Sequence, residues 1–153
     1  MPAASSISFS GISVIVPCLN EEASIGQVIE RARRGIAKLT PPRAGAVWQE
    51  EIIVVDNNST DRSAQFAREH GARVITERGR GYGSALRRGF AEARHELIVM
   101  GDGDLSYDFE ALNDLVRPIL EGRADFVVGN RMKSIRPGAM PTLHRYLGNP
   151  LLS

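Results

Sequence analysis

The chain has 153 residues, 42% of them hydrophobic, so it can bury one core of ordinary size and we expect a single domain over residues 1–153. Its 19 basic and 18 acidic residues leave a formal net charge of +1, which excludes strong overall attraction to nucleic acid and requires any anionic ligand to be held locally. The single cysteine, Cys18, excludes an internal disulfide and is typical of a reducing compartment, and no apolar stretch approaches the roughly 18 residues needed to cross a bilayer, so we expect a cytoplasmic protein.

Strand and helix patterns alternate along the chain. A run rich in β-branched residues predicts a first strand at Ile12–Val16, and apolar residues at three- and four-residue steps predict a helix over Ile25–Leu39 that ends before Pro41. The remaining predicted elements are, in chain order, a strand at Ile52–Val55, a helix capped by Ser59 or Thr60 and stopped by Gly71, a strand at Val74–Thr76, a helix over Ser84–Arg94, a strand at Leu97–Met100, a helix over Phe109–Ile119 in which Pro118 is a kink or a restart, and a strand at Phe126–Val128. This alternation predicts an α/β fold with a Rossmann-like, mostly parallel sheet and helices on both faces. Residues 130–153 lack periodicity and are expected to be irregular.

Polar residues gather directly after four of the five predicted strands. In an open parallel sheet, ligands bind in the crevice beyond the carboxyl ends of the strands, so we expect these side chains to face one crevice. Taken singly, each group could also be an ordinary turn, because Asp, Asn and Gly are common turn residues. The residues are Pro17, Leu19, Asn20 and Glu21 after the first strand, Asp56, Asn57, Asn58, Ser59 and Asp61 after the second, Asp102, Gly103 and Asp104 after the fourth, and Gly129, Asn130 and Arg131 after the fifth.

The most specific of these segments is Asp102-Gly103-Asp104, because two carboxylates two residues apart on an extended chain project to the same side. Such a pair suits Mg²⁺ or Mn²⁺, which take one or two protein carboxylates and complete their shell with water and substrate phosphates. We therefore predict that Asp102 and Asp104 bind a metal ion that holds a nucleoside diphosphate. Gly103 would leave room for a sugar or ribose beside the backbone.

Two other motifs have to be weighed in this region. An EF-hand fails because its turn glycine would fall at Tyr107 and its bidentate glutamate at Asn113. The glycine-rich loop Gly79–Gly83 misses the dinucleotide fingerprint because Ser84 stands where the last glycine is required. That loop could place Arg80 and backbone amides against a phosphate, or it could be an ordinary surface turn.

Four segments, in this order and spacing, resemble glycosyltransferase family 2, whose members have the GT-A fold. They are Val14–Glu21, Val54–Asp61, Gly101–Asp104 and Val128–Arg131. Within the family the likeness is greatest to dolichol-phosphate mannosyltransferase-like and other polyprenyl-phosphate sugar transferases, which the segment Arg136–Asn149 also resembles. The resemblance implies nucleotide contact by Pro17, Leu19, Glu21 and Asp56, metal and diphosphate contact by Asp102 and Asp104, and phosphate contact by Arg131 and Arg145.

The activity implied by the resemblance is inverting transfer of a sugar from a nucleoside-diphosphate sugar, either GDP-mannose or a UDP-sugar, to an acceptor. Asp104, through the metal ion, and Arg131 would be the catalytic residues, because both stabilise charge on the leaving diphosphate. No carboxylate base can be placed in the sequence, which favours an acceptor that is already anionic, such as polyprenyl or dolichyl phosphate. A lipid acceptor implies peripheral contact with the cytoplasmic face of a membrane.

Family members usually continue beyond the length of this chain, so we expect a C-terminally truncated transferase. One alternative is an inactive nucleotide-sugar-binding module, which would bind the donor without transferring its sugar. Another is nucleotidyl transfer on a similar sheet, although Pro17–Glu21 stand where such enzymes carry a glycine-rich loop with basic residues.

Overall fold

The computed structural model describes residues 9–41 and 46–129, which form a four-stranded parallel sheet with the strand order β3-β2-β1-β4. The strands are β1 (Gly11–Cys18), β2 (Gln49–Asp56), β3 (Arg73–Thr76) and β4 (Leu97–Met100). The helices are α1 (Ile25–Ala37), α2 (Ser63–Glu69), α3 (Tyr82–Glu92), the short 3-10 helix η1 (Phe109–Ala111) and α4 (Leu112–Leu120). The α/β prediction with a parallel sheet is confirmed.

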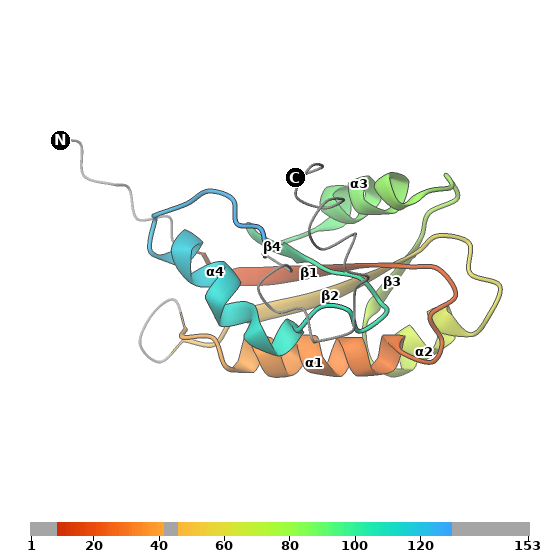
Figure 1. Ribbon diagram of the computed structural model, residues 1–153, viewed down its shortest axis with the longest axis horizontal. Coiled ribbons are helices and arrows are strands. Elements are labelled where there is room, and N and C mark those ends of the chain that lie inside the picture. The colour runs from red at the N-terminus through yellow and green to blue at the C-terminus, as the bar shows by residue number, and fades with distance from the viewer. Residues whose placement is uncertain (1–8, 42–45, 130–153) are drawn as a thin grey trace, which may run out of the picture.

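Helices cover both faces of the sheet, as the sequence predicted. Figure 1 shows α1 and α2 along one face and α3 on the opposite face. The larger core lies under α1, where Val14 and Val16 of β1 pack in the same cluster as Ile29. The smaller core lies under α3 and combines Ile15 of β1 with residues of β2 and Ala85. Because successive residues of β1 point to opposite faces, one strand supplies both cores.

The apolar residues of helix α1 lie on its buried side, as their spacing in the sequence predicted. Its predicted stripe is buried: Ile25, Val28, Ile29 and Ala32 have no exposed surface, and Ile36 is 3% exposed. At three- and four-residue steps these side chains lie on one side of the helix, which faces the sheet. Gly35 lies on the buried side too, and a Cβ atom there would overlap the Phe109 carbonyl oxygen of η1.

Two local predictions were wrong, and one of the two alternatives at Pro118 is excluded. Residues Phe126–Val128 form no strand: Phe126 is 81% exposed and Val128 is 73% exposed. A β-branched run supplies propensity only, and a strand also needs a neighbour with which to exchange backbone hydrogen bonds.

The other differences concern α2 and α4. Ser59 and Thr60 do not cap α2, whose N-cap is Arg62, and Ser59 instead accepts a hydrogen bond from another loop. Pro118 does not restart the fourth helix, because α4 continues through it to Leu120. A proline in the last turn removes only one backbone donor, and tertiary packing of the buried Leu112 and Val116 holds the helix together.

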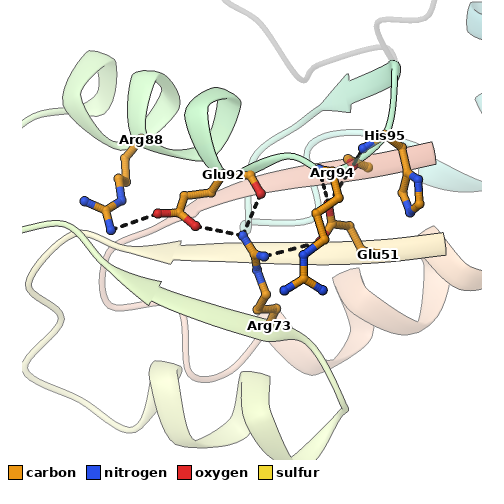
Figure 2. Close-up of polar contacts among 7 residues, drawn as sticks. Glu51, Arg73, Arg88, Glu92, Arg94 and His95 are labelled. Atoms are coloured by element: carbon orange, nitrogen blue, oxygen red, sulfur yellow. Dashed lines mark hydrogen bonds and ion pairs between the residues drawn. The ribbon is translucent and has the colours of Figure 1, made fainter. Parts of the chain in front are cut away.

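A partly buried ionic network, made of Ser13, Glu51, Arg73, Glu92 and the Arg94 amide, lies at the amino ends of the strands under the end of α3 (Figure 2). Glu51 Oε1 accepts hydrogen bonds from Ser13 Oγ at 2.8 Å and from the Arg94 amide at 2.6 Å. Arg73 donates to the Glu92 carbonyl at 2.6 Å and to its carboxylate at 3.0 Å, and lies 3.7 Å from Glu51 Oε2. The network joins β1, β2 and β3 to the end of α3.

Only the centre of the network is enclosed, because the Arg73 and Glu92 side chains are 27% and 34% exposed. The Glu51 side chain is only 10% exposed. Glu51 Oε2 and Arg73 Nε are buried and make no hydrogen bond within the described part of the chain, so their mutual attraction has to offset their loss of water.

Within residues 9–41 and 46–129, no helix is both long enough and apolar enough to cross a bilayer.

Candidate functional site

A pocket of about 520 Å³ opens beyond the carboxyl ends of the strands, opposite the ionic network. It brings together three loops that are far apart in the sequence, those following β1, β2 and β4, and the loop that leads into α3. The lining residues that the sequence singled out are Pro17, Leu19, Glu21, Asn57, Asn58, Arg80, Asp102, Gly103 and Asp104. Cys18, Gly81, Tyr82 and Ala85 complete the lining.

Asp56 is 7% exposed and does not line this pocket; its Oδ1 accepts a hydrogen bond from the Ser59 amide at 3.2 Å. Its contact with a nucleotide therefore stays a prediction. Arg131 and Arg145 lie outside the described residues, as does the irregular segment 130–153.

The Asp102-Gly103-Asp104 segment is held at both ends by backbone and side-chain contacts. Ser24 Oγ, just before α1, donates to the Gly103 carbonyl at 2.6 Å. The Ser106 amide donates to Asp104 Oδ1 at 2.9 Å, and the Tyr82 hydroxyl donates to Asp102 Oδ1 at 2.7 Å. Hydrogen bonds to carboxylate oxygens orient both acidic groups before a ligand arrives.

The glycines of this segment have different roles. A Cβ at Gly101 would come within 2.5 Å of Phe109 Cζ, so glycine is needed for the buried Phe109 ring to pack beneath the end of β4. A Cβ at Gly103 would meet Glu21, Ile25 and Pro17 atoms only at 3.5 Å, an ordinary contact distance.

The donors fit a hard divalent cation. Asp102 and Asp104 supply carboxylate oxygens at the edge of an open pocket, and Mg²⁺ or Mn²⁺ commonly uses one or two such groups with water and phosphate as the other ligands. In the described ranges no group of three or more His, Cys, Asp or Glu side chains is arranged to hold a metal ion. A metal ion held by this pair would need further ligands, such as water or phosphate oxygens.

The loops after β1 and β2 are interlocked by hydrogen bonds between residues about forty positions apart. The Asn20 amide donates to Ser59 Oγ at 3.0 Å, and the Thr60 amide donates to Asn20 Oδ1 at 2.8 Å. The Glu21 amide donates to Ser63 Oγ at 2.7 Å, which fixes the backbone of a pocket residue. Asn20 and Ser59, which sequence reasoning placed among the polar crevice residues, therefore bond to each other's loops.

Asp61 is part of the same interlock. Its carboxylate accepts hydrogen bonds from the Ser63 amide at 2.9 Å and from the Glu22 amide at 3.1 Å. Partial burial acts to raise the Asp61 pKa, but hydrogen bonds from Ser63 and Glu22 outweigh it, so the pKa is lower than usual. Asp61 thus joins the start of α2 to the loop after β1.

Cys18 forms part of the pocket wall but is 2% exposed. Burial raises the pKa of its thiol to about 11, and the neighbouring Asp56 carboxylate acts in the same direction. The thiol is therefore neutral near pH 7 and unsuited to nucleophilic chemistry.

Sequence reasoning missed Tyr82 as a site residue. Tyr82 is 50% exposed, lines the pocket and reaches from the start of α3 to Asp102. The available signal was an aromatic residue inside the glycine-rich loop beside Arg80. Its partner lies 20 residues further along the chain, and no local periodicity reveals such a pair.

Residues 13–146 match the profile of glycosyl transferase family 2. The chain is 41% identical over 143 residues to the low-salt glycan biosynthesis hexosyltransferase Agl6 of Haloferax volcanii, a match that covers 93% of this chain and 33% of Agl6. It is 32% identical over 130 residues to the undecaprenyl-phosphate 4-deoxy-4-formamido-L-arabinose transferase of Proteus mirabilis, covering 80% of this chain and 37% of that protein.

Solved structures give the same result. Glucosyl-3-phosphoglycerate synthase from Mycobacterium tuberculosis, in complex with Mn²⁺, UDP-glucose and phosphoglyceric acid, matches with a TM-score of 0.58 and 33% identity over 74% of this chain and 40% of that one. The sheet and its helices thus match a GT-A glycosyltransferase. The chain spans between 33% and 40% of the length of these three proteins. Because the family profile extends over residues 13–146, the chain belongs to glycosyl transferase family 2.

Proposed function

We propose that the chain forms a single nucleotide-sugar-binding domain of a metal-dependent glycosyltransferase, which takes a hexose from a UDP- or GDP-sugar. The observation that carries this proposal is the convergence of Asp102, Asp104, Glu21 and Arg80 on one pocket at the carboxyl edge of the sheet. Two carboxylates and a guanidinium suit a metal-bridged diphosphate, because the cation and the arginine offset its negative charge.

We assign roles to the pocket residues from their placement and chemistry. Asp102 and Asp104 would hold Mg²⁺ or Mn²⁺, which when bound supplies charge neutralisation on the leaving diphosphate. Arg80, in the loop that leads into α3, would contact a phosphate of the donor. Pro17, Leu19 and Glu21 would line the part of the pocket that holds the nucleoside. Arg131 is proposed as a further catalytic contact to the diphosphate, and Asp56 as a contact to the base or ribose.

For the acceptor we propose a polyprenyl phosphate at the cytoplasmic face of a membrane, positioned by Arg131 and Arg145. Support comes from the similarity to an undecaprenyl-phosphate sugar transferase. An anionic phosphate acceptor needs no general base, so the reaction would rely on positioning and charge stabilisation.

A turnover assay tests the proposal. The chain is incubated with Mn²⁺, with UDP-glucose or GDP-mannose, and with short-chain polyprenyl phosphate, and the glycolipid and the released nucleoside diphosphate are measured. Formation of both, dependent on Mn²⁺, is the expected result. Binding of the donor without glycolipid would reduce the function to nucleotide-sugar binding. In a parallel incubation with a nucleoside triphosphate, release of pyrophosphate would replace it with nucleotidyl transfer.

A further inference from the structure

Asn57, the first residue after β2, lies in the wall of the pocket and is 7% exposed. We infer that Asn57 is a positioning residue. Its side-chain amide fixes the loop Glu77–Gly81 and thereby holds the backbone of Arg80 in place at the pocket. The inference rests on the proposed function, since it assigns the positioning of the phosphate-binding Arg80 to a residue that does not itself contact the ligand.

The Asn57 side chain makes three hydrogen bonds to the backbone of that loop. Its Nδ2 donates to the Glu77 carbonyl at 3.0 Å and to the Gly79 carbonyl at 2.7 Å, and its Oδ1 accepts from the Gly81 amide at 2.9 Å. A primary amide has two N–H donors, so both are used within the protein. Asn57 could donate to a ligand only by releasing the loop.

Two of these bonds lie on either side of Arg80. Gly79 precedes Arg80 and Gly81 follows it, and each is bonded to Asn57. The backbone of Arg80 is therefore fixed at both neighbours, and Arg80 itself is exposed and lines the pocket. Fixing the backbone lowers the number of positions that a long side chain can sample before it meets a phosphate.

The backbone of Asn57 is itself held by a hydrogen bond to the neighbouring strand. Its amide donates to the Cys18 carbonyl at 2.9 Å, and the Glu77 amide donates to the Asp56 carbonyl at 2.9 Å. The asparagine is thus attached to the ends of β1 and β2, and the loop leaves β3 beside it.

The hydrogen bond from the Gly81 amide to Asn57 also fixes the N-cap residue of α3. The Gly81 carbonyl accepts from the Ser84 amide at 3.1 Å and from the Ala85 amide at 3.2 Å, which closes the first turn of the helix. Tyr82, in that turn, donates to Asp102. One asparagine therefore connects the position of Arg80 with that of a proposed metal ligand.

The chemistry requires an amide at this position. Aspartate has nearly the same shape but no donor at neutral pH, and would place one carboxylate oxygen against both the Glu77 and the Gly79 carbonyl. The neighbouring Asn58 makes only longer bonds to the same loop, at 3.2 and 3.3 Å, and is exposed.

The test measures the Kd of UDP and of GDP with Mn²⁺ by calorimetry, for the full chain and for Asn57→Asp, alone and combined with Arg80→Ala. Asn57→Asp should weaken binding by roughly tenfold or more, because apparent affinity falls with the fraction of chains whose loop is set for binding. In the Arg80→Ala background the same change should raise Kd by a smaller factor than in the unaltered chain, since residues that act as a unit are not additive. Asn57→Ala, which adds no charge, is the second variant.

Arg33→Ala is the matched control. Arg33 also donates to two loop carbonyls, those of His70 at 2.6 Å and Gly71 at 3.1 Å, but it does not line the pocket. This variant should lower the melting temperature and leave the nucleotide Kd unchanged. Hydrogen exchange of residues 77–85 should quicken in Asn57→Asp and stay unchanged in Arg33→Ala.

The outcomes separate the inference from the proposed function. Unchanged Kd in Asn57→Asp and Asn57→Ala, or an equal loss of affinity with and without Arg80, would overturn the positioning role alone. If the unaltered chain bound neither nucleotide with Mn²⁺, the proposed function would be overturned, and the exchange measurement would still decide whether Asn57 holds the loop.

Discussion

At the scale of single residues, Asp104 offers the most direct test of the metal site. Asparagine keeps the shape of aspartate but removes the charge that a hard cation prefers. We expect Asp104→Asn to weaken Mn²⁺-dependent UDP or GDP binding by roughly tenfold or more, equivalent to about 1.4 kcal/mol, as measured by calorimetry. Asp114→Asn, an exposed carboxylate on α4, is the control and should leave Kd unchanged. Equal effects of the two changes would remove Asp104 from the metal site.

Gly81 tests the backbone of the loop before α3. Its φ of 113° and ψ of 150° lie in a region that only glycine adopts readily. A Cβ there would meet no atom within 4 Å, so any cost of Gly81→Ala would be conformational, and we expect a loss of about 1–3 kcal/mol in urea unfolding.

Gly83 is the matched control for Gly81. A Cβ at Gly83 would also meet no atom within 4 Å, but this residue lies inside α3, where alanine is favoured over glycine by about 0.5–1 kcal/mol. Gly83→Ala should therefore stabilise the chain. Opposite signs for the two substitutions would establish that backbone conformation, and not space, requires glycine at position 81.

Cys18 gives a chemical test of burial. With a pKa of about 11, only about one thiol in a thousand is ionised at pH 8, and the thiolate is the species that reacts. We expect Cys18 to react with a disulfide reagent at pH 8 only after urea unfolds the chain. The raised pKa also predicts loss of stability as pH rises from about 9 towards 11, because the unfolded chain ionises first. Rapid labelling of the folded chain would contradict this picture.

At the scale of elements, the contact between α1 and η1 depends on Gly35. A Cβ at that position would overlap the Phe109 backbone carbonyl, which cannot rotate away as a side chain would. Gly35→Ala should therefore destabilise the chain by about 1–3 kcal/mol in urea unfolding, despite the better helix propensity of alanine. Gln27→Ala, on the exposed side of α1, should change stability by less than about 0.5 kcal/mol. A stabilised Gly35→Ala chain would mean that α1 and η1 are further apart.

The elements also show what the sequence can and cannot predict. The strands β1, β2 and β4 and the stripe of α1 follow from local periodicity, because burial repeats with the geometry of the element itself. The apolar run at Phe126–Val128 has the same composition as a strand but is exposed, since pairing depends on a neighbour that a local pattern cannot reveal. The position of Asp102 and Asp104 in the pocket was predictable because both residues closely follow the end of a strand.

The positions of Asn57 and Ser63 were not predictable in the same way. Their partners lie 20 to 42 residues away, at Glu77, Gly79 and Gly81 for Asn57 and at Glu21 for Ser63. Both residue types are common in turns, so their composition alone indicates only a loop.

At the scale of the whole molecule, the ionic network and the pocket lie at opposite ends of the sheet, so we expect changes in the network to affect stability and not ligand binding. Glu51 lies at the amino end of β2 in the ionic network, away from the pocket. Glu51→Ala would leave Ser13 Oγ and the Arg94 amide without their acceptor, so it should cost about 1–3 kcal/mol in urea unfolding. Below the unfolding transition, its nucleotide Kd should stay unchanged.

Glu50→Ala is the control for Glu51. Glu50 makes a surface ion pair with Arg33 at 3.5 Å, with both side chains 40% exposed, and such pairs contribute at most about 1 kcal/mol. Similar losses for Glu50→Ala and Glu51→Ala would show that the network contributes no more than an exposed pair.

The length of β2 has a practical consequence for spectroscopy. Its eight residues rise roughly 3.3 Å each, so the two ends of the sheet are about 23 Å apart. A fluorophore attached through Glu96→Cys, an exposed position just before β4, would sit at the far end from any bound nucleotide. Because the native thiol is enclosed, the dye would couple to the introduced one alone, and its emission would register denaturation without interference from the ligand.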